Sequence, residues 1–486
     1  MGKKKSIVLM VLLTIVIVVL CAITVVPSFA IPGTVKIWNP VVSQYDLGTD
    51  LGGGYYAYYY PTGVISETEY KNLEEKDKSS YVEHGGLYLN NDPELGIIAS
   101  NGKVRQEFAD NFAKATAEIT ARYAAKGYSD YRVAVVDDYA LRVQIPSSEA
   151  TEQQTAFQNA YNTFGLFAET SALEIKKGDA LVDERAENEV DEIIKSFDVK
   201  TKQGVAYIEV KFTDIGKEMV KSYKDSTDTT DKLTIMLGEQ SIMEIDAANH
   251  VTTKNVVQYP IAYESEIGYV ETMVILLNSA LENGGFDIEF SQISNSQVRA
   301  YGPVYGEKTL DLLYIALAVV IVLMIAISIV KMGGFGVASA YSTISYLVVI
   351  AICYAFVTKG VFEITLGSVL VFLLGMVLVN VFNMHVYNAI KTEFSFGKTV
   401  ESSVKSGYKK TLMEMVDVWS VLLLGSAALL IGTAGLHTLA LQAILCVVTG
   451  AFCSLLWTRV ISAMLMSASK NKYKYFRLVR EEDDDE

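Results

Sequence analysis

Cysteine and histidine are scarce in this chain, and their scarcity excludes several kinds of site. Only four cysteines and four histidines occur among 486 residues. Every cysteine lies in a long apolar run, so the polar part of the chain has no disulfide framework. The histidines form no close pair of the kind that binds zinc: His84, His250, His385 and His437. We therefore expect neither a metal site nor a cofactor.

Signatures of nucleotide binding and nucleophilic catalysis are also missing. The stretch "FGKT", 396–399, resembles the end of a Walker A loop, but Thr392 stands where that pattern needs a glycine. The glycines of "LGTDLGGGYYAYYY", 47–60, run into strand-forming tyrosines rather than into the helix that a phosphate loop requires. No nucleophile elbow or Cys-x-x-Cys motif occurs. The chain is not predicted to be an enzyme.

Long apolar runs, by contrast, are abundant, and hydrophobic residues make up 51% of the chain. The first run, 7–30, ends in Ser28 and Ala30, which would suit a signal-peptidase site. Its roughly 20 apolar residues exceed the ~7–15 of a signal peptide, so we expect an uncleaved anchor. Five further membrane spans are predicted at 309–330, 340–358, 363–386, 413–432 and 438–460.

Basic residues predict the orientation of these spans. Lysine and arginine gather in the N-terminus, 1–6, in an amphipathic loop, 387–412, and in the charged tail, 461–486. A six-span topology puts all three segments on one side, which the positive-inside rule makes cytoplasmic. Residues 31–308 are then extracytoplasmic. Their excess of acidic over basic residues argues against nucleic acid as a partner.

The extracytoplasmic region is predicted to be an α+β domain of two halves, about 46–175 and 204–295, joined by an acidic linker or insertion at 176–203. In the first half, an amphipathic helix at 106–126 precedes a hairpin that turns at Asp137 and Asp138. In the second half, strands and helices alternate in a βαββαβ order that ends with a strand in "FDIEFSQI". That order predicts a ferredoxin-like sheet backed by two helices.

A run of tyrosines follows the glycine cluster: Tyr55, Tyr56, Tyr58, Tyr59 and Tyr60. Tyrosine combines apolar area with a hydrogen-bonding tip, so this strand could contact an extended polypeptide substrate. The alternative is a strand that is buried on one face and covered by loops on the other.

Polar residues within the spans are the candidates for a proton or polar relay, because a charge at the bilayer centre costs ~2.5–3.5 kcal/mol. Asn380 and Asn383 share a helix face in the fourth span, Asp417 opens the fifth and Arg459 closes the sixth. At 1.5 Å per residue, Asp417 and Arg459 differ in depth by about 10 Å. Arg459 is therefore either a partner of Asp417 or an anchor at the helix end.

Several of these motifs together resemble the SecD family of the RND superfamily. "LGTDLGGG" resembles the family's L-G-L-D-L-x-G-G signature, with Asp50, Gly52 and Gly53 in register. "ALENGGFDIEFSQISNSQVRAYGPVYGEKTLDLL" resembles the passage into the second span, and "GTAGLHTLALQAI" and "LLWTR" follow late motifs. The resemblance implies six transmembrane helices and a ferredoxin-like extracytoplasmic domain between the first and second.

The resemblance also implies a role and partners. SecD is an accessory subunit of the Sec translocase in the bacterial cytoplasmic membrane. It assists unfolded preproteins beside the SecYEG channel while the proton motive force drives protons through its membrane part. A separate SecF partner is expected, since six spans contain no SecF half. The lipid bilayer is the remaining partner.

One departure from the family concerns proton coupling. The family's fourth span reads G-M-A-V-D-A-N-V, whereas this one reads "GMVLVNVFNMHVYNAI", with Val379 or Val381 at the aspartate. Asparagine cannot release a proton at physiological pH. Asp417 is retained from the family's F-D-A-N motif, although Trp419 replaces its asparagine. Either Asp417, with acids from SecF, carries the relay, or the chain holds substrate without driving protons. A second class is an RND-like scaffold repurposed for binding or lipid handling without proton coupling.

Overall fold

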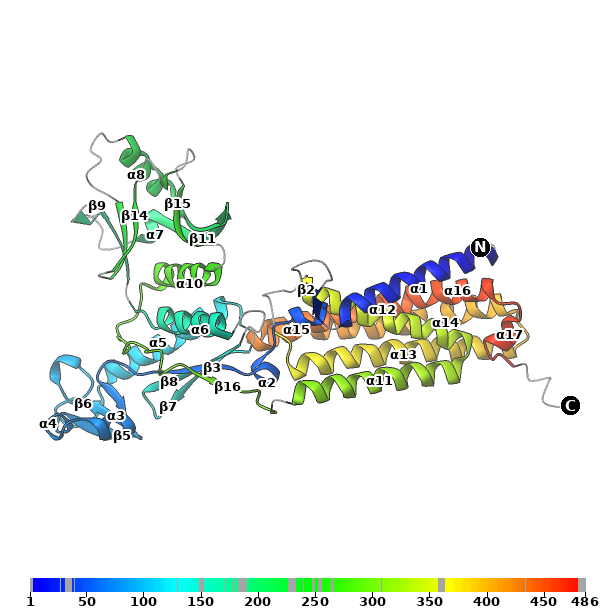
Figure 1. The fold of residues 1–486 in the computed structure, drawn as a ribbon, viewed down its shortest axis with the longest axis horizontal. Helices are drawn as coiled ribbons and strands as arrows, with labels where there is room; N and C mark the ends of the chain where they lie inside the picture. The colour runs from blue at the N-terminus through cyan, green and yellow to red at the C-terminus, as the bar shows by residue number, and fades with distance from the viewer. Residues whose placement is uncertain are drawn as a thin grey trace. The chain divides into compact units, whose positions relative to one another are not determined.

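The computed structural model divides into two compact units. The helical unit comprises residues 1–53, 147–150 and 302–486, and the α+β unit comprises 54–146 and 151–301 (Figure 1). The structure describes residues 3–26, 28–30, 37–38, 40–128, 130–147, 153–170, 172–177, 180–181, 190–225, 233–238, 240–246, 250–251, 256–263, 266–306, 308–356, 363–432 and 434–479.

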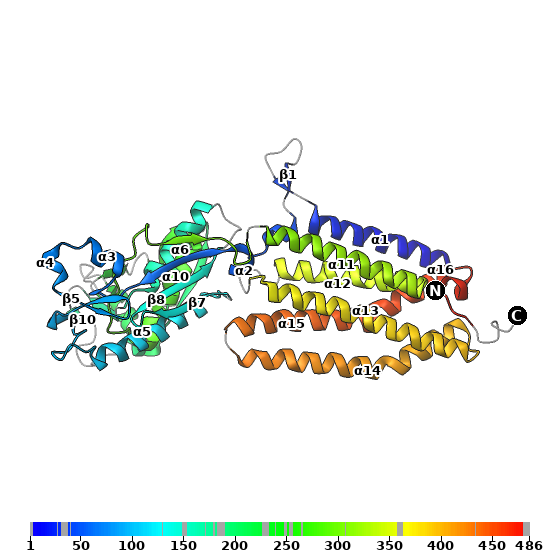
Figure 2. The ribbon, with the colours of Figure 1, turned by 90° about the horizontal axis from the view of Figure 1, so that it is seen from below.

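Over the described residues, the helical unit has six helices that are long and apolar enough to cross a membrane. They run side by side in Figure 2. The first five are α1 (Lys3–Val25), α11 (Thr309–Met332), α12 (Gly334–Phe356), α13 (Leu366–Ser395) and α14 (Val400–Ala428). The sixth is α15 (Ala434–Phe452), which continues through a π-helical turn, Cys453–Trp457, into α16 (Thr458–Ala468).

The segment expected as an amphipathic loop, 387–412, is instead helical at both ends. α13 continues to Ser395 and α14 already begins at Val400. Gly397 adopts φ +85°, which allows the tight turn between them, and Thr399 caps α14 by accepting from Ser402 N. Hydropathy misses these extensions because it detects only the apolar part of a helix.

Small residues bring the membrane helices close together. A Cβ on Gly336 of α12 would lie 2.0 Å from the Ser328 carbonyl oxygen of α11, and one on Gly375 of α13 would lie 2.2 Å from Tyr346 Oη of α12. Such small residues are typical of helix contacts in membranes, where association depends on close packing. α13 packs on α12, α14 and α15, while α1 packs on α12 and α16.

The α+β unit contains a ferredoxin-like sheet in its first half, with strand order β16-β3-β8-β7 and antiparallel pairing throughout. Its elements are β3 (Gly54–Tyr59), α5 (Gln106–Ala125), β7 (Arg132–Val136), β8 (Ala140–Pro146), α6 (Gln153–Phe167) and β16 (Arg299–Tyr301). The predicted hairpin turn is confirmed, with φ +50° at Asp137 and +68° at Asp138. Aromatic and aliphatic residues of α5 cover one face of the sheet, as the helical pattern predicted.

The expectation of this topology in the second half was wrong. The closing strand is β16, whereas the described residues of "FDIEFSQI" form only an isolated bridge, Pro61 to Phe290. The chain returns to the first sheet only after the whole second half has been inserted. Sequence periodicity cannot show which distant strand completes a sheet.

A small three-stranded sheet, β4-β6-β5, interrupts the first half between β3 and α5. It is built from β4 (Val64–Ser66), α3 (Glu67–Asn72), α4 (Glu75–Lys78), β5 (Tyr81–His84) and β6 (Leu87–Asn90). Tyr70 of α3 stacks on Tyr88 of β6, with ring centroids 3.7 Å apart. The sequence analysis did not anticipate this insertion.

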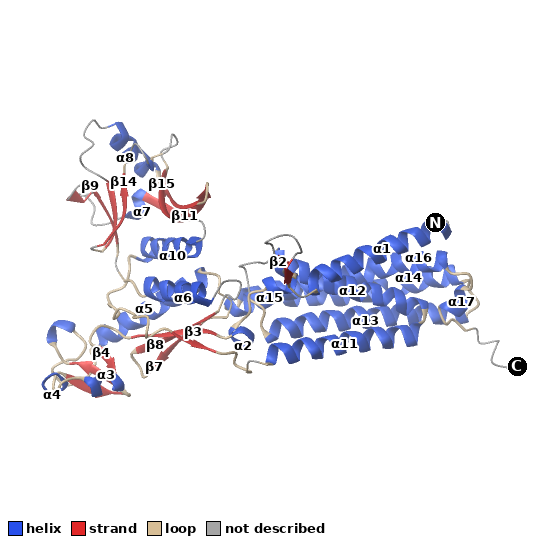
Figure 3. Ribbon diagram, viewed as in Figure 1, coloured by secondary structure: helices blue, strands red, loops and turns tan. Residues whose placement is uncertain are grey.

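The second half holds two further sheets, β11-β12-β15 and β10-β9-β13-β14 (Figure 3). Its elements are β9 (Leu173–Lys177), β10 (Ala180–Leu181), α7 (Val190–Ile193), β11 (Ile194–Lys202), β12 (Val205–Phe212), α8 (Asp214–Asp225), β13 (Leu233–Leu237), β14 (Gln240–Ile245), β15 (Val257–Tyr263) and α10 (Ile267–Asn283). The expected linker, 176–203, is therefore corrected: its described residues include β11, which pairs along β12. α10 packs on β11 and β12 and also contacts α5 and α6.

Candidate functional site

The signature segment, residues 46–53, docks onto the start of α13. Leu47 forms a parallel bridge with Ile364, Gly48 N donates to Ile364 O at 2.9 Å, and Ile364 N donates to Asp46 O at 2.7 Å. Asp50 Oδ2 accepts from Leu366 N at 2.7 Å, which places a carboxylate at the amino end of α13. A negative charge there satisfies an orphan N–H group and complements the helix dipole. Asp50 thus has a structural role within the helical unit.

The glycines of this segment serve a turn and a close contact. Gly52 ends the short helix α2 (Thr49–Gly52), and Gly53 follows with φ +71°. A Cβ on Gly54 would lie 2.1 Å from Ile145 O, so only glycine lets β3 approach β8 at this point. The cluster therefore joins α2 to β3.

Four of the five tyrosines divide between the two faces of β3, and Tyr60 directly follows the strand. Tyr55 and Tyr59 are 5% and 0% exposed and belong to the core. Tyr59 Oη lies 2.6 Å from Tyr123 Oη and donates to Phe164 O at 2.8 Å. Burial raises the pKa of Tyr59 far above its usual range. These two tyrosines hold the helices to the sheet and cannot contact a substrate.

Tyr56 and Tyr58 lie half-buried on the opposite face of the sheet, and half-buried Tyr60, beyond the end of β3, also packs against the core. Arg142 of β8 lies over Tyr56, 4.9 Å from the ring centroid, and over Tyr58 at 6.0 Å. Tyr58 and Tyr60 stack at 6.0 Å, and Tyr301 of β16 lies 6.1 Å from Tyr56. We call this group the tyrosine face: Tyr56, Tyr58, Tyr60, Arg142 and Tyr301. Ring faces, hydroxyl groups and a guanidinium suit contact with an extended polypeptide.

In the helical unit, an amide–hydroxyl cluster joins three membrane helices: Ser328 of α11, Ser339 and Thr343 of α12, and Asn380 and Asn383 of α13. Asn380 Oδ1 accepts from Ser328 Oγ at 3.0 Å and from Ser339 Oγ at 3.3 Å, and its Nδ2 donates to Thr343 Oγ1 at 2.9 Å. Asn383 Nδ2 donates to Ser339 Oγ at 2.9 Å. All five side chains are buried. The two asparagines thus share a face, as predicted.

This cluster is electrically neutral. Its members are serine, threonine and asparagine, none of which exchanges a proton at physiological pH. Asn383 Oδ1 is buried and has no hydrogen-bond partner among the described residues. The arrangement can bridge helices by hydrogen bonds, which in membranes contribute about 0.6–2 kcal/mol each, but it cannot by itself relay protons.

Asp417 and Arg459 are both exposed on the helical unit. No ion pair among the described residues joins them, so this structure does not bring the two charges together. Arg459 instead lies over the ring of Tyr408, 5.5 Å from its centroid. The neighbouring Trp419 is buried and donates to Ser454 Oγ, in the π-helical turn, at 3.0 Å.

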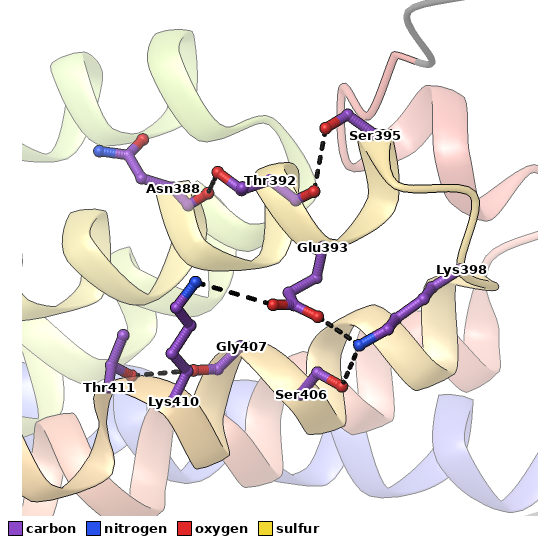
Figure 4. A network of polar contacts seen from close by, with 9 residues as sticks. All are labelled: Asn388, Thr392, Glu393, Ser395, Lys398, Ser406, Gly407, Lys410 and Thr411. Carbon is purple, nitrogen blue, oxygen red and sulfur yellow. Dashed lines mark hydrogen bonds and ion pairs between the residues drawn. The ribbon is translucent and has the colours of Figure 1, made fainter.

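The sequence analysis did not identify two charged contacts between α13 and α14. His385 Nε2 lies 2.7 Å from Glu414 Oε2, linking α13 to α14 on their exposed side. At the turn between these helices, Glu393 pairs with Lys398 and lies 3.9 Å from Lys410, and Lys398 donates to Ser406 Oγ at 3.0 Å (Figure 4). The (i, i+29) spacing of His385 and Glu414 gives no sequence signal, because it appears only when the two helices pair.

A buried arginine in the α+β unit was also missed. Arg122 of α5 donates from Nε to Ser279 Oγ of α10 at 2.7 Å, and from Nη1 to Phe167 O at 3.0 Å and Glu169 O at 2.6 Å. Burial lowers its pKa to about 10. Arg122 therefore ties α5, the end of α6 and α10 together. Over the residues that the structure describes, no group of three or more metal-ligating side chains converges.

Comparison with known proteins adds two findings. Protein translocase subunit SecD of Borreliella burgdorferi is 29% identical over 184 residues, which are 37% of this chain and 31% of that protein. A crystal structure of SecDF in its super-membrane-facing form matches 96% of this chain and 59% of its own, with a TM-score of 0.55 and 16% identity. The chain thus spans less than two thirds of either relative. No family model matches the sequence.

The structural likeness establishes the fold, and the sequence relative carries the same family name. The chain is SecD/SecDF-like. It is an α+β membrane protein with six candidate spans, as the motifs predicted.

The structure locates the departure of this SecD-like chain from the family pattern. Val379 is fully buried beside Asn380, whereas Val381 is 50% exposed. Val379, the position obtained by aligning from "GM", therefore points into the helix bundle. Val381, the position obtained by aligning from "NAI", points out of it. At the inward position the SecD-like chain has a valine next to a neutral cluster.

Proposed function

We propose that this SecD-like chain is an accessory subunit of the Sec protein-export translocase in the bacterial cytoplasmic membrane. The observation that carries the proposal is the SecDF fold over 96% of the chain, together with a sequence relative that is a translocase subunit. The α+β unit acts on preproteins outside the membrane, both termini are cytoplasmic, and the SecYEG channel is the partner. The lysine-rich 1–6 and 461–486 support this orientation.

A separate SecF subunit completes the membrane part in this proposal. Asp417 is exposed on α14, and a charged side chain that faces lipid is unfavourable. Helices of SecF packed on this side of α14 would remove that cost and supply further acids for a proton relay. The neutral amide–hydroxyl cluster then links α11, α12 and α13 by hydrogen bonds.

The tyrosine face is the proposed substrate contact, with three of the five tyrosines taking part. Tyr56, Tyr58 and Tyr60 present rings and hydroxyls on the face of the sheet that α5 and α6 leave open. Extended chains of varied sequence can bind there because ring stacking and backbone hydrogen bonds do not depend on particular side chains.

The test is affinity purification of the chain from its native membrane in mild detergent, with a photo-crosslinking residue at position 58. We expect SecF and SecYEG subunits to co-purify and secreted preproteins to crosslink. The matched control is a crosslinker at Val135, which is 50% exposed on the other face of the same sheet. A preparation that lacks Sec subunits, or equal crosslinking from both positions, would contradict the proposal.

The second candidate is an RND-like scaffold that binds or handles lipid without proton coupling. The neutral cluster at the family's aspartate favours it. The same purification distinguishes the two, because this candidate predicts partners from outside the Sec machinery.

A further inference from the structure

A cavity of about 440 Å³ lies within the helical unit. Four of the membrane helices and the segment before β3 form its walls. Its principal lining residues are Cys21 and Val25 of α1, Leu317 and Ile321 of α11, Leu347 of α12 and Phe372 of α13, and Leu47 and Leu51 close one end. Its volume falls within the ~300–1,000 Å³ of ligand pockets.

The lining of this cavity is apolar and carries no charged side chain. Three of the hydroxyl groups that line it are bonded within the helical unit: Thr24 Oγ1 donates to Leu20 O, Tyr45 Oη donates to Ala351 O at 3.0 Å, and Ser368 Oγ lies 3.1 Å from Thr365 Oγ1. The hydroxyl hydrogens of Thr24 and Tyr45 are thus already committed to protein acceptors and cannot be donated to a polar ligand. The lining, which is almost entirely apolar, therefore suits a hydrocarbon ligand.

The cavity is open rather than sealed, and its rim includes Val25, 66% exposed, and Tyr314, 44% exposed. α1 and α11 both present exposed apolar side chains along their length, such as Val18 at 60% and Val322 at 65%. Helices with that composition face lipid tails when they span a membrane. The opening beside them therefore meets acyl chains instead of water.

We propose that this cavity binds one acyl chain of a membrane phospholipid. The cavity has room for no more than about one turn of α-helix, which at ~10 Å across and 5.4 Å high occupies about 420 Å³, so it is not a groove for a whole partner helix. An acyl chain is thin and flexible, so it can follow the wall from the rim to Leu47 and Leu51. Protein interiors are close-packed, and an apolar hole open to hydrocarbon is filled by it.

The bound acyl chain stabilises the position of the signature segment, residues 46–53. Leu47 and Leu51 line the cavity on either side of Asp50, and Asp50 caps α13. The acyl chain thus packs against residues 46–51 at the place where they dock on the start of α13. The inference is independent of the Sec role proposed above.

The experiment uses the full chain in phosphatidylethanolamine vesicles that contain a phospholipid with a photoreactive palmitoyl chain. After illumination, adducts are mapped by mass spectrometry. We expect adducts at the lining positions of α11 and α12 to exceed those at Leu312 and Leu323, which are exposed on α11 but do not line the cavity, by about tenfold. Equal labelling of lining and non-lining positions would overturn the proposal.

Two variants test whether filling the cavity removes the bound phospholipid. Leu317→Trp fills the cavity and is expected to abolish the lining adducts and the co-purifying phospholipid seen by native mass spectrometry. Leu323→Trp, on the lipid-facing side of the same helix, should leave both unchanged. If Leu317→Trp does not fold, the adduct map of the unmodified chain still decides. The vesicles contain no translocase component, so this experiment measures lipid binding alone. Its failure is therefore distinguishable from failure of the proposed export role.

Discussion

Asp50 and Lys126 each join two elements that are far apart in the sequence. Asp50 caps α13 across more than three hundred intervening residues by accepting from Leu366 N. Lys126, at the end of α5, donates to Gly268 O at 2.9 Å and lies 3.3 Å from Glu271 Oε2, both at the start of α10. In each case a charged side chain contacts the first turn of a helix that is distant in the sequence.

Replacing Asp50 tests its role as a cap. Asp50→Ala removes the acceptor of the Leu366 N–H group and should lower the free energy of unfolding by about 0.5–2 kcal/mol. Asp50→Asn keeps an acceptor without the charge and should cost less. Thermal unfolding in detergent measures both. The interpretation fails if the alanine variant is as stable as the unmodified chain.

Lys126 gives a pH dependence with a definite sign. Burial lowers its pKa below the ordinary 10.5, against the opposing effect of Glu271. Between the lowered pKa and 10.5 the unfolded chain therefore binds more protons than the folded one, and stability rises with pH in that window. The difference in stability between the unmodified chain and Lys126→Met should grow across it. A difference that stays constant with pH would contradict this.

At the scale of elements, hydrogen bonds between neutral side chains hold α11, α12 and α13 together. Asn380 alone contacts both other helices, through Ser328 and through Ser339 and Thr343. Hydrogen bonds between neutral side chains persist as the pH changes, whereas a carboxyl group at this position would change its protonation state.

Asn380→Asp should make the link between these helices pH-sensitive. An ionised carboxylate in this buried site is unfavourable, so the variant should be destabilised more at pH 9 than at pH 5. Asn380→Leu, which loses the same hydrogen bonds but carries no acid, should be destabilised equally at both. Unfolding temperatures in detergent at the two pH values provide the measurement, and parallel behaviour of the two variants would refute the idea.

For the whole molecule, the division into two units means that the α+β unit should be separable. All four strands of the ferredoxin-like sheet and the whole second half lie within residues 54–301. That stretch has no cysteine, so its stability depends on its apolar cores alone. Burial of this extent is sufficient for an independent domain of its size.

A fragment of residues 54–301 should therefore be soluble and unfold cooperatively without the membrane helices. Circular dichroism during heating should show a single transition at the same temperature with and without reductant. An unfolded or aggregated fragment in aqueous buffer would show that the helical unit is needed to complete the fold.

Local sequence patterns were sufficient where the physical cause is itself local. The membrane spans follow from the length of apolar runs, the Asp137–Asp138 turn from residues that tolerate positive φ, and the buried face of α5 from its periodicity. The shared helix face of Asn380 and Asn383 follows from the same periodicity, whereas the structure shows that this face is buried.

The pairing of distant segments required the structure. Strand β16 completes the sheet by placing Arg299 opposite Tyr56, and only that sheet shows that Tyr55 and Tyr59 are core residues while Tyr56 and Tyr58 are not. The composition of the chain determined a membrane protein with an acidic polar region and no disulfides, because hydropathy and charge are properties of single residues. Tertiary structure decided the neutral cluster, the capping by Asp50 and the apolar cavity, because each depends on contacts between helices that the chain brings together only on folding.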